Sequence, residues 1–147
     1  MCINHYKIQK MKRYILTSIL AAIVGFAANM AVGFIFIYLI PSLEGEYGNT
    51  LIFRPWEDPF MSLYFLHPFY IAFVLAWIWG RTKSHFNGKI SKQAFIFTNI
   101  YVLVATIPGL MLSISSFKIS VAITLSWAVG AYIQTYFMSL IFAKNLR

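Results

Sequence analysis

Residues 14–40 read YILTSILAAIVGFAANMAVGFIFIYLI, and this stretch decides the fold class. It contains no Asp, Glu, Lys or Arg, and it stops at Pro41. A transmembrane helix needs about 20 mainly apolar residues, because the hydrocarbon core is about 30 Å thick and each helical residue rises about 1.5 Å. The run exceeds the core of a typical signal peptide, which is about 7–15 residues. We therefore expect it to remain in the protein as a membrane span.

Three further stretches have the same apolar character and also lack acidic and basic residues. They cover about residues 60–80, 93–115 and 119–143. Backbone polar groups in lipid must be hydrogen-bonded within the chain, so unbroken apolar runs of this length form helices rather than open strands. We predict an all-α fold, an integral membrane bundle of four antiparallel transmembrane helices in a single domain at 14–147. Residues 1–13 are expected to form a cytoplasmic tail, and residues 41–59 an outer loop.

The composition agrees with a membrane protein. The 147 residues are 60% hydrophobic and 11% charged, whereas an ordinary soluble domain is about 45–50% apolar and about 25% charged. So few charged side chains would not cover a water-facing surface of this size. The high hydrophobicity excludes intrinsic disorder, and the single cysteine, Cys2, excludes a disulfide scaffold.

The charged residues predict the direction in which the helices cross. All but two of the 12 basic residues precede the first span, separate the second from the third, or follow the fourth. The two exceptions, Arg54 and Lys118, fall on the other side together with every acidic residue. Basic loops stay in the cytoplasm, so we expect a multi-pass cell-membrane protein with both termini cytoplasmic. The scattered basic residues predict attraction to the lipid bilayer and no binding to nucleic acid.

Two of the predicted helices carry, at every fourth position, three small residues and one carboxamide. These are Ala21, Gly25, Asn29 and Gly33 in the first span, and Ala122, Ser126, Gly130 and Gln134 in the fourth. Residues four apart share a helix face, and small residues let membrane helices approach closely. One interpretation is tight helix packing with an amide hydrogen bond. The other is a cavity or oligomer contact lined by Asn29 and Gln134.

His67 is the only side chain in a predicted span that can carry a charge. An ionisable group in lipid is a candidate functional residue, and the alternative is a neutral imidazole hydrogen-bonded to a polar neighbour. Counting residues from the span ends places Asn29 and His67 in one polar layer of the outer half. The same count places Asn99 and Gln134 in a second layer of the inner half, near Thr98 and Tyr101.

The outer loop contains all the acidic residues. Its centre holds Arg54, Trp56, Glu57 and Asp58, which together with His67 could line an outward-facing pocket. Carboxylates beside a basic side chain and an aromatic ring can hold a cation or act as general acid and base. The alternative is a solvated acidic loop in which Asp58 caps the helix that begins at Pro59.

Several chemistries lack the residues that they need. The three histidines, His5, His67 and His85, are too widely spaced for a usual metal site. A lone Cys2 cannot form a dithiol, and the chain contains no Gly-rich phosphate loop or nucleophile motif. We therefore expect no metal and no cofactor, and we identify no catalytic residue.

Four short motifs resemble those of small uncharacterised four-helix prokaryotic membrane proteins. They are FRPWEDPF at 53–60, IPGLM at 107–111, SSF at 115–117 and LSW at 125–127. The resemblance covers about residues 14–147. It implies the four-span topology and supplies no activity.

Three functions remain compatible with the sequence. The first is a small oligomeric transporter, channel or accessory subunit, with a second copy or another membrane protein as its partner. The second is a membrane enzyme acting on a lipid-like substrate at an outward-facing site around His67. The third is a purely structural membrane protein. No residue pattern identifies a substrate.

Overall fold

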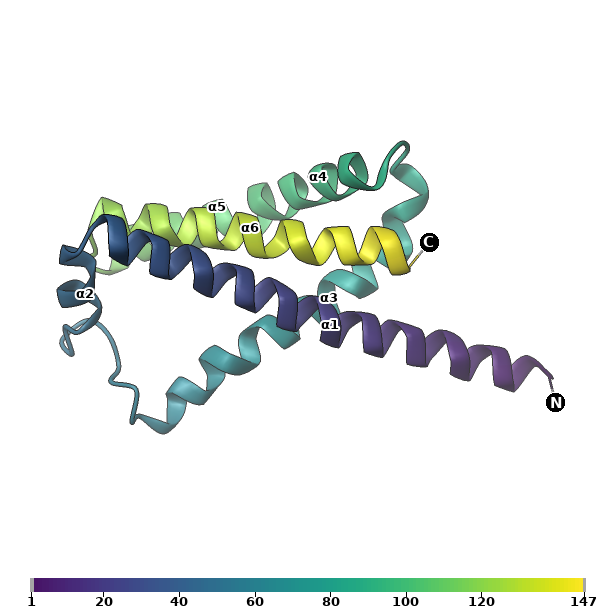
Figure 1. The fold of residues 1–147 in the computed structure, drawn as a ribbon, viewed down its shortest axis with the longest axis horizontal. Coiled ribbons are helices and arrows are strands. Elements are labelled where there is room, and N and C mark those ends of the chain that lie inside the picture. Colours follow the sequence, from purple (N-terminus) through teal and green to yellow (C-terminus); the bar gives the residue numbers. More distant parts are fainter. Residues whose placement is uncertain (1, 147) are drawn as a thin grey trace.

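The computed structural model describes residues 2–146, which form an all-helical chain without strands (Figure 1). Four helical segments are long and apolar enough to cross a membrane. They run antiparallel, so the predicted fold class is confirmed. The helices are α1 (Cys2–Leu39), α2 (Ser42–Tyr47), η1 (Pro59–Met61), α3 (Ser62–Thr82), η2 (Lys83–His85), α4 (Ile90–Tyr101), the π-helical η3 (Val102–Thr106), α5 (Ile107–Ser116) and α6 (Val121–Asn145).

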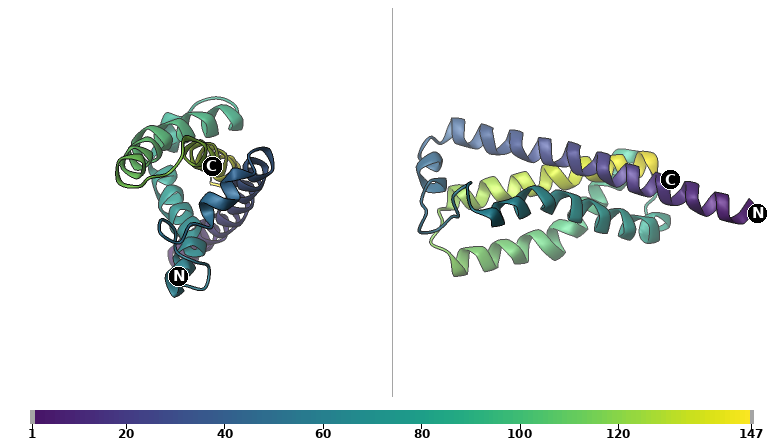
Figure 2. Two further views of the ribbon diagram at one scale, coloured as in Figure 1. Left: turned by 90° about the vertical axis from the view of Figure 1, so that its left-hand side faces the viewer. Right: turned by 90° about the horizontal axis from the view of Figure 1, so that it is seen from below.

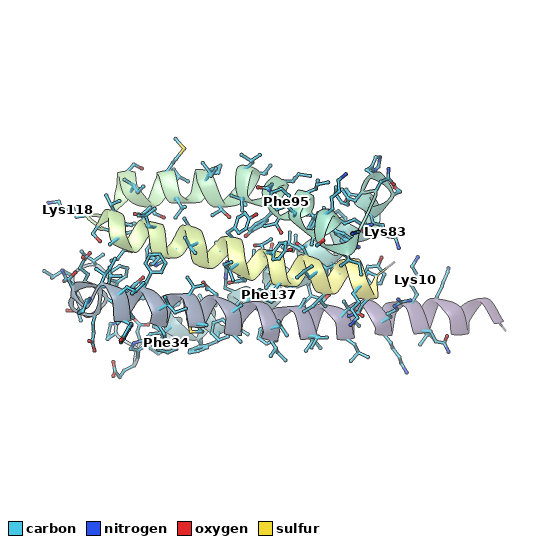
Figure 3. The ribbon with its side chains drawn as sticks, turned by 45° about the horizontal axis from the view of Figure 1, so that its top comes forward. Lys10, Phe34, Lys83, Phe95, Lys118 and Phe137 are labelled. Carbon is cyan, nitrogen blue, oxygen red and sulfur yellow. The ribbon has the colours of Figure 1, made fainter. Side chains whose placement is uncertain are left out.

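The two ends of the bundle differ in charge. The end with the chain termini and the 83–89 turn is called the basic end, and the end with residues 40–58 and 117–120 is called the loop end. Lys10 and Lys83 lie at the basic end and Lys118 at the loop end (Figure 3). All four acidic residues belong to the loop end. The structure therefore gathers on one end the basic segments that the sequence separates.

Helix α1 begins earlier than the sequence suggested. It starts at Cys2 and not near residue 14, and its first turns extend past the rest of the bundle (Figure 2). The stretch 2–13 contains neither Gly nor Pro, and most of its residues have ordinary helix propensity. Nothing in the local sequence ends the helix where the charges begin.

The third span contains a π-helical turn. The backbone N–H of Ile107 donates to the carbonyl of Val102, five residues earlier. The next residue, Pro108, has no N–H to donate, and π-turns inserted in α-helices accommodate such interruptions. Before the turn, α4 packs closely on α6; beyond it, α5 makes few contacts with α6 and buries none of its residues.

The hydrophobic core lies toward the basic end, where the four spans converge. It consists of Ala21, Ala22, Ala72, Leu75, Ala76, Trp79, Phe97, Met138, Phe142, Ala143 and Leu146. The Trp79 ring stacks on Phe86 and meets the edge of Phe97, with centroids 5.4 and 5.1 Å apart. At the loop end, the first turns of α3 extend away from α5 and α6 (Figure 1). The residues that α3 buries therefore all follow His67.

Candidate functional site

The two small-residue faces meet where α1 packs on α6. A Cβ atom on Gly25 would lie 2.8 Å from the side chain of Met138 and 3.1 Å from the backbone oxygen of Gln134. One turn further along, the side-chain oxygen of Asn29 lies directly against Gly130. The two helices thus touch at both glycines, and the contact leaves no space for a channel between them.

The outermost residues of the two small-residue faces differ from the central ones in burial and in contacts. Ala21 is fully buried in the core, whereas a Cβ atom on Gly33 would meet no atom within 4 Å. On α6, Ser126 is buried and Ala122 is half-buried. Gly33 therefore takes no part in the close approach, because the contact does not extend to the last turns of α1.

The two carboxamides at this contact are not joined by a hydrogen bond. Gln134 is 6% exposed and Asn29 is half-buried. Among the side chains of residues 7–146, neither side-chain amide has a hydrogen-bond partner. The close approach of the helices therefore depends on the small residues, and the expected amide hydrogen bond is absent from this structure.

A buried hydroxyl pair joins α4 to α6. The Thr98 hydroxyl donates to Ser139 Oγ at 3.2 Å, and the Ser139 hydroxyl donates to the carbonyl of Thr135 at 2.7 Å. The Asn99 side chain instead donates to the carbonyl of Phe95 in its own helix, at 2.7 Å. The polar layer expected from Asn99 and Gln134 is thus made by Thr98 and Ser139. Thr98 was expected near this layer, whereas Ser139 was not, and the sequence signal for Ser139 is that it lies four positions from Thr135, another small polar residue.

His67 is exposed on the surface of α3. Its imidazole has no hydrogen-bond partner in the described part of the chain. Asn29 faces α6, so the two residues expected to share an outer layer are not brought together by any contact that the structure shows. The neighbouring Tyr64 does reach α1, where its ring meets Phe26 edge-on at 5.9 Å.

Arg54 and Asp58 of the loop form an ion pair. Arg54 Nη1 lies 2.7 Å from Asp58 Oδ2, and its guanidinium stands 5.1 Å from the centroid of the Phe60 ring. Asp58 Oδ1 accepts the backbone N–H of Phe60 at 2.8 Å, which confirms the predicted helix cap. This N–H, and then the Arg54 guanidinium, lower the pKa of Asp58 below its ordinary 3.8. Glu57 is exposed and takes no part in these contacts.

Tyr47 anchors the loop to α6, a role that the sequence did not reveal. Trp127 Nε1 donates to the Tyr47 hydroxyl at 3.1 Å, and Ser126 Oγ lies 3.0 Å from the same hydroxyl. The Phe53 ring packs between Tyr47 and Trp127, with centroids 5.6 and 6.2 Å away. Leu43 of α2, in the same loop, is fully buried. An aromatic residue in a polar loop was the only available signal.

The residues named from the sequence therefore divide into separate groups. Gly25, Gly130 and the two carboxamides lie at the α1–α6 contact. The Arg54–Asp58 pair lies in the loop, and His67 lies alone on α3. Comparisons with protein-family models, curated proteins and solved structures found no match to this chain. The functional argument accordingly depends on where these groups lie.

Proposed function

We propose that the chain is a multi-pass cell-membrane subunit that works by associating with another membrane helix. The partner is a second copy of the chain or another membrane protein, which makes the chain an oligomeric or accessory component of a transporter or channel. The observation that supports this proposal is the exposed, unpaired imidazole of His67. It lies about 12 Å along the helix from Pro59, at about 1.5 Å per residue.

A lipid environment would not satisfy this imidazole. Polar side chains in hydrocarbon are unfavourable, and histidines within spans almost always face protein or a water-filled cavity. The surrounding surface offers area for a partner helix, since Leu63, Leu66 and Tyr70 are 57%, 59% and 69% exposed. Lipid acyl chains can cover these apolar side chains, but they cannot supply a hydrogen bond to His67.

The enzyme alternative receives less support from the geometry. Asp58 uses both carboxylate oxygens, one on Arg54 and one on a backbone N–H. Arg54 is likewise paired, and no contact joins either residue to His67 in the part of the chain that the structure describes. Because α1 and α6 touch at Gly25 and Gly130, we place any transport pathway between chains.

We also propose that the basic end faces the cytoplasm. The support is the segregation of basic residues at that end and of all acidic residues at the other. Reporter fusions at residues 50, 86 and 147 test the orientation. The fusion at 50 should report an external location and the other two a cytoplasmic one, and the reverse pattern would refute the proposal.

Photo-crosslinking tests the partner surface. A benzophenone amino acid in place of His67 should capture a protein in intact membranes, and mass spectrometry of the product distinguishes a second copy from another protein. The control is the same amino acid in place of Ile107, which is exposed on α5 about 14 Å from Ser116. If both positions yield only lipid adducts, the proposed association is wrong.

A further inference from the structure

A groove of about 420 Å³ lies between α1 and α3 at the basic end. Its lining includes Lys10 and Tyr14 from α1 and Phe73, Trp77 and Arg81 from α3. None of its lining residues is acidic. The groove is separate from the α1–α6 contact and from the surface around His67, since neither Gly25 nor His67 is among its lining residues.

The groove is polar at one end and apolar at the other. The Tyr14 hydroxyl lies against Gly80, which aligns the two helices. Lys10 lies one helical turn beyond Tyr14 toward the N-terminus, and Arg81 directly follows Gly80, so both cations lie toward the water. In the opposite direction the lining continues with Ile15 and Phe73, toward the middle of the membrane.

Arg81 is held in position but not neutralised. Its guanidinium carbon lies 3.8 Å from the centroid of the Trp77 ring, a cation–π contact that orients the plane of the group. Its Nη1 makes only a long 3.4 Å contact with the carbonyl of Trp77. Among the side chains of residues 7–146, the one ion pair is Arg54–Asp58 at the loop end. Within this range Lys10 and Arg81 therefore have no carboxylate partner.

We propose that this groove binds one anionic phospholipid, with its phosphate between Lys10 and Arg81 and an acyl chain along Phe73 and Ile15. The order of cations, aromatic rings and apolar side chains along the groove is the order of phosphate, glycerol region and acyl chain in a lipid of that leaflet. The planar guanidinium matches the oxygens of a phosphate, and Trp77 has the amphipathic character of residues at the membrane interface. Basic pockets between transmembrane helices are known to hold anionic headgroups.

A free phosphate ion would use only the cationic end of the groove. The continuous apolar part favours a phospholipid, because burial of an acyl chain adds a hydrophobic contribution that an inorganic ion lacks. The proposal requires only that the four spans lie in a bilayer, and it does not depend on His67 or on a protein partner.

Native mass spectrometry of the full chain, released from vesicles of phosphatidylcholine and phosphatidylglycerol, tests the proposal. The wild-type chain should retain one phosphatidylglycerol in preference to phosphatidylcholine. The double variant Lys10→Gln/Arg81→Gln should bind it about thirtyfold more weakly, as expected for two basic residues near an anionic headgroup. The matched control Arg13→Gln/Lys89→Gln removes the same charges from exposed positions outside the groove and should bind like the wild type.

Three results would overturn the proposal. Equal weakening in both double variants would mean that general surface charge, and not the groove, attracts the lipid. Equal retention of phosphatidylcholine would mean that the groove holds acyl chains without recognising the headgroup. Displacement of the lipid by millimolar inorganic phosphate would mean that the groove is a simple anion site.

Discussion

The side-chain oxygen of Asn29 on α1 lies against Gly130 on α6, in the space that a side chain at position 130 would need. Gly25 makes the corresponding approach to Met138 one turn away. Helix association in membranes depends on close van der Waals packing, since lipid supplies little hydrophobic force between helices. The α1–α6 contact is therefore closely packed, and it specifies how the first and last spans dock.

Gly130→Leu should destabilise the protein by about 3 kcal/mol, the upper part of the range for overpacked contacts. The added side chain would displace Asn29 and force α1 away from α6. Thermal unfolding in mild detergent measures the effect. Gly33→Leu is the control, because no atom lies within 4 Å of the corresponding Cβ position. Equal melting temperatures for the two variants would contradict the close approach at Gly130.

The Thr98–Ser139 hydrogen bond should appear as an energetic coupling between α4 and α6. A double-mutant cycle with Thr98→Val and Ser139→Ala should give about 0.6 kcal/mol, the average for hydrogen bonds between membrane helices. A second cycle with Asn99→Ala and Ser139→Ala should show no coupling, because Asn99 bonds within its own helix. Coupling in the second cycle alone would mean that Asn99, and not Thr98, bonds Ser139.

Tyr47→Phe should loosen the loop from α6. The substitution removes the hydroxyl that accepts from Trp127 Nε1 and pairs with Ser126, at a cost of about 1 kcal/mol. Limited proteolysis of the loop should become faster, and the melting temperature should fall. Tyr38→Phe is the matched control, because Tyr38 is 85% exposed. Unchanged proteolysis in Tyr47→Phe would show that the aromatic packing alone holds the loop.

Stability should depend on the ionisation of Asp58. Its pKa is lowered in the folded chain, first by the Phe60 N–H and then by Arg54, so its contribution is present above the ordinary value of 3.8 and is lost as the pH falls through the lower folded pKa. Asp58→Asn retains an acceptor for the cap but cannot titrate. Between pH 5 and about pH 2.5, the melting temperature of the wild type should fall further than that of the variant. If the melting temperatures of the wild type and the variant fell equally with pH, the Asp58 charge would have no role in stability.

Sequence reasoning identified the right helices but paired several polar residues wrongly. Small residues four positions apart marked the α1–α6 contact, because their spacing on a helix face is independent of the neighbour. The count from the span ends placed Asn99 and Thr98 at the same depth, but only Thr98 bonds α6, because successive residues on a helix point about 100° apart. Span ends place a residue by depth, but depth does not determine which way its side chain points.

The sequence by itself determined the four spans, the separation of basic from acidic ends and the cap at Asp58. These features depend on the length of apolar runs, the order of charges and contacts between residues close in the chain. Only the tertiary structure decided that Asn29 meets Gly130, that Thr98 bonds Ser139 and that Lys10 shares a groove with Arg81. The physical reason is that the rotation of each helix about its axis is set by packing against its neighbours, which no single span encodes.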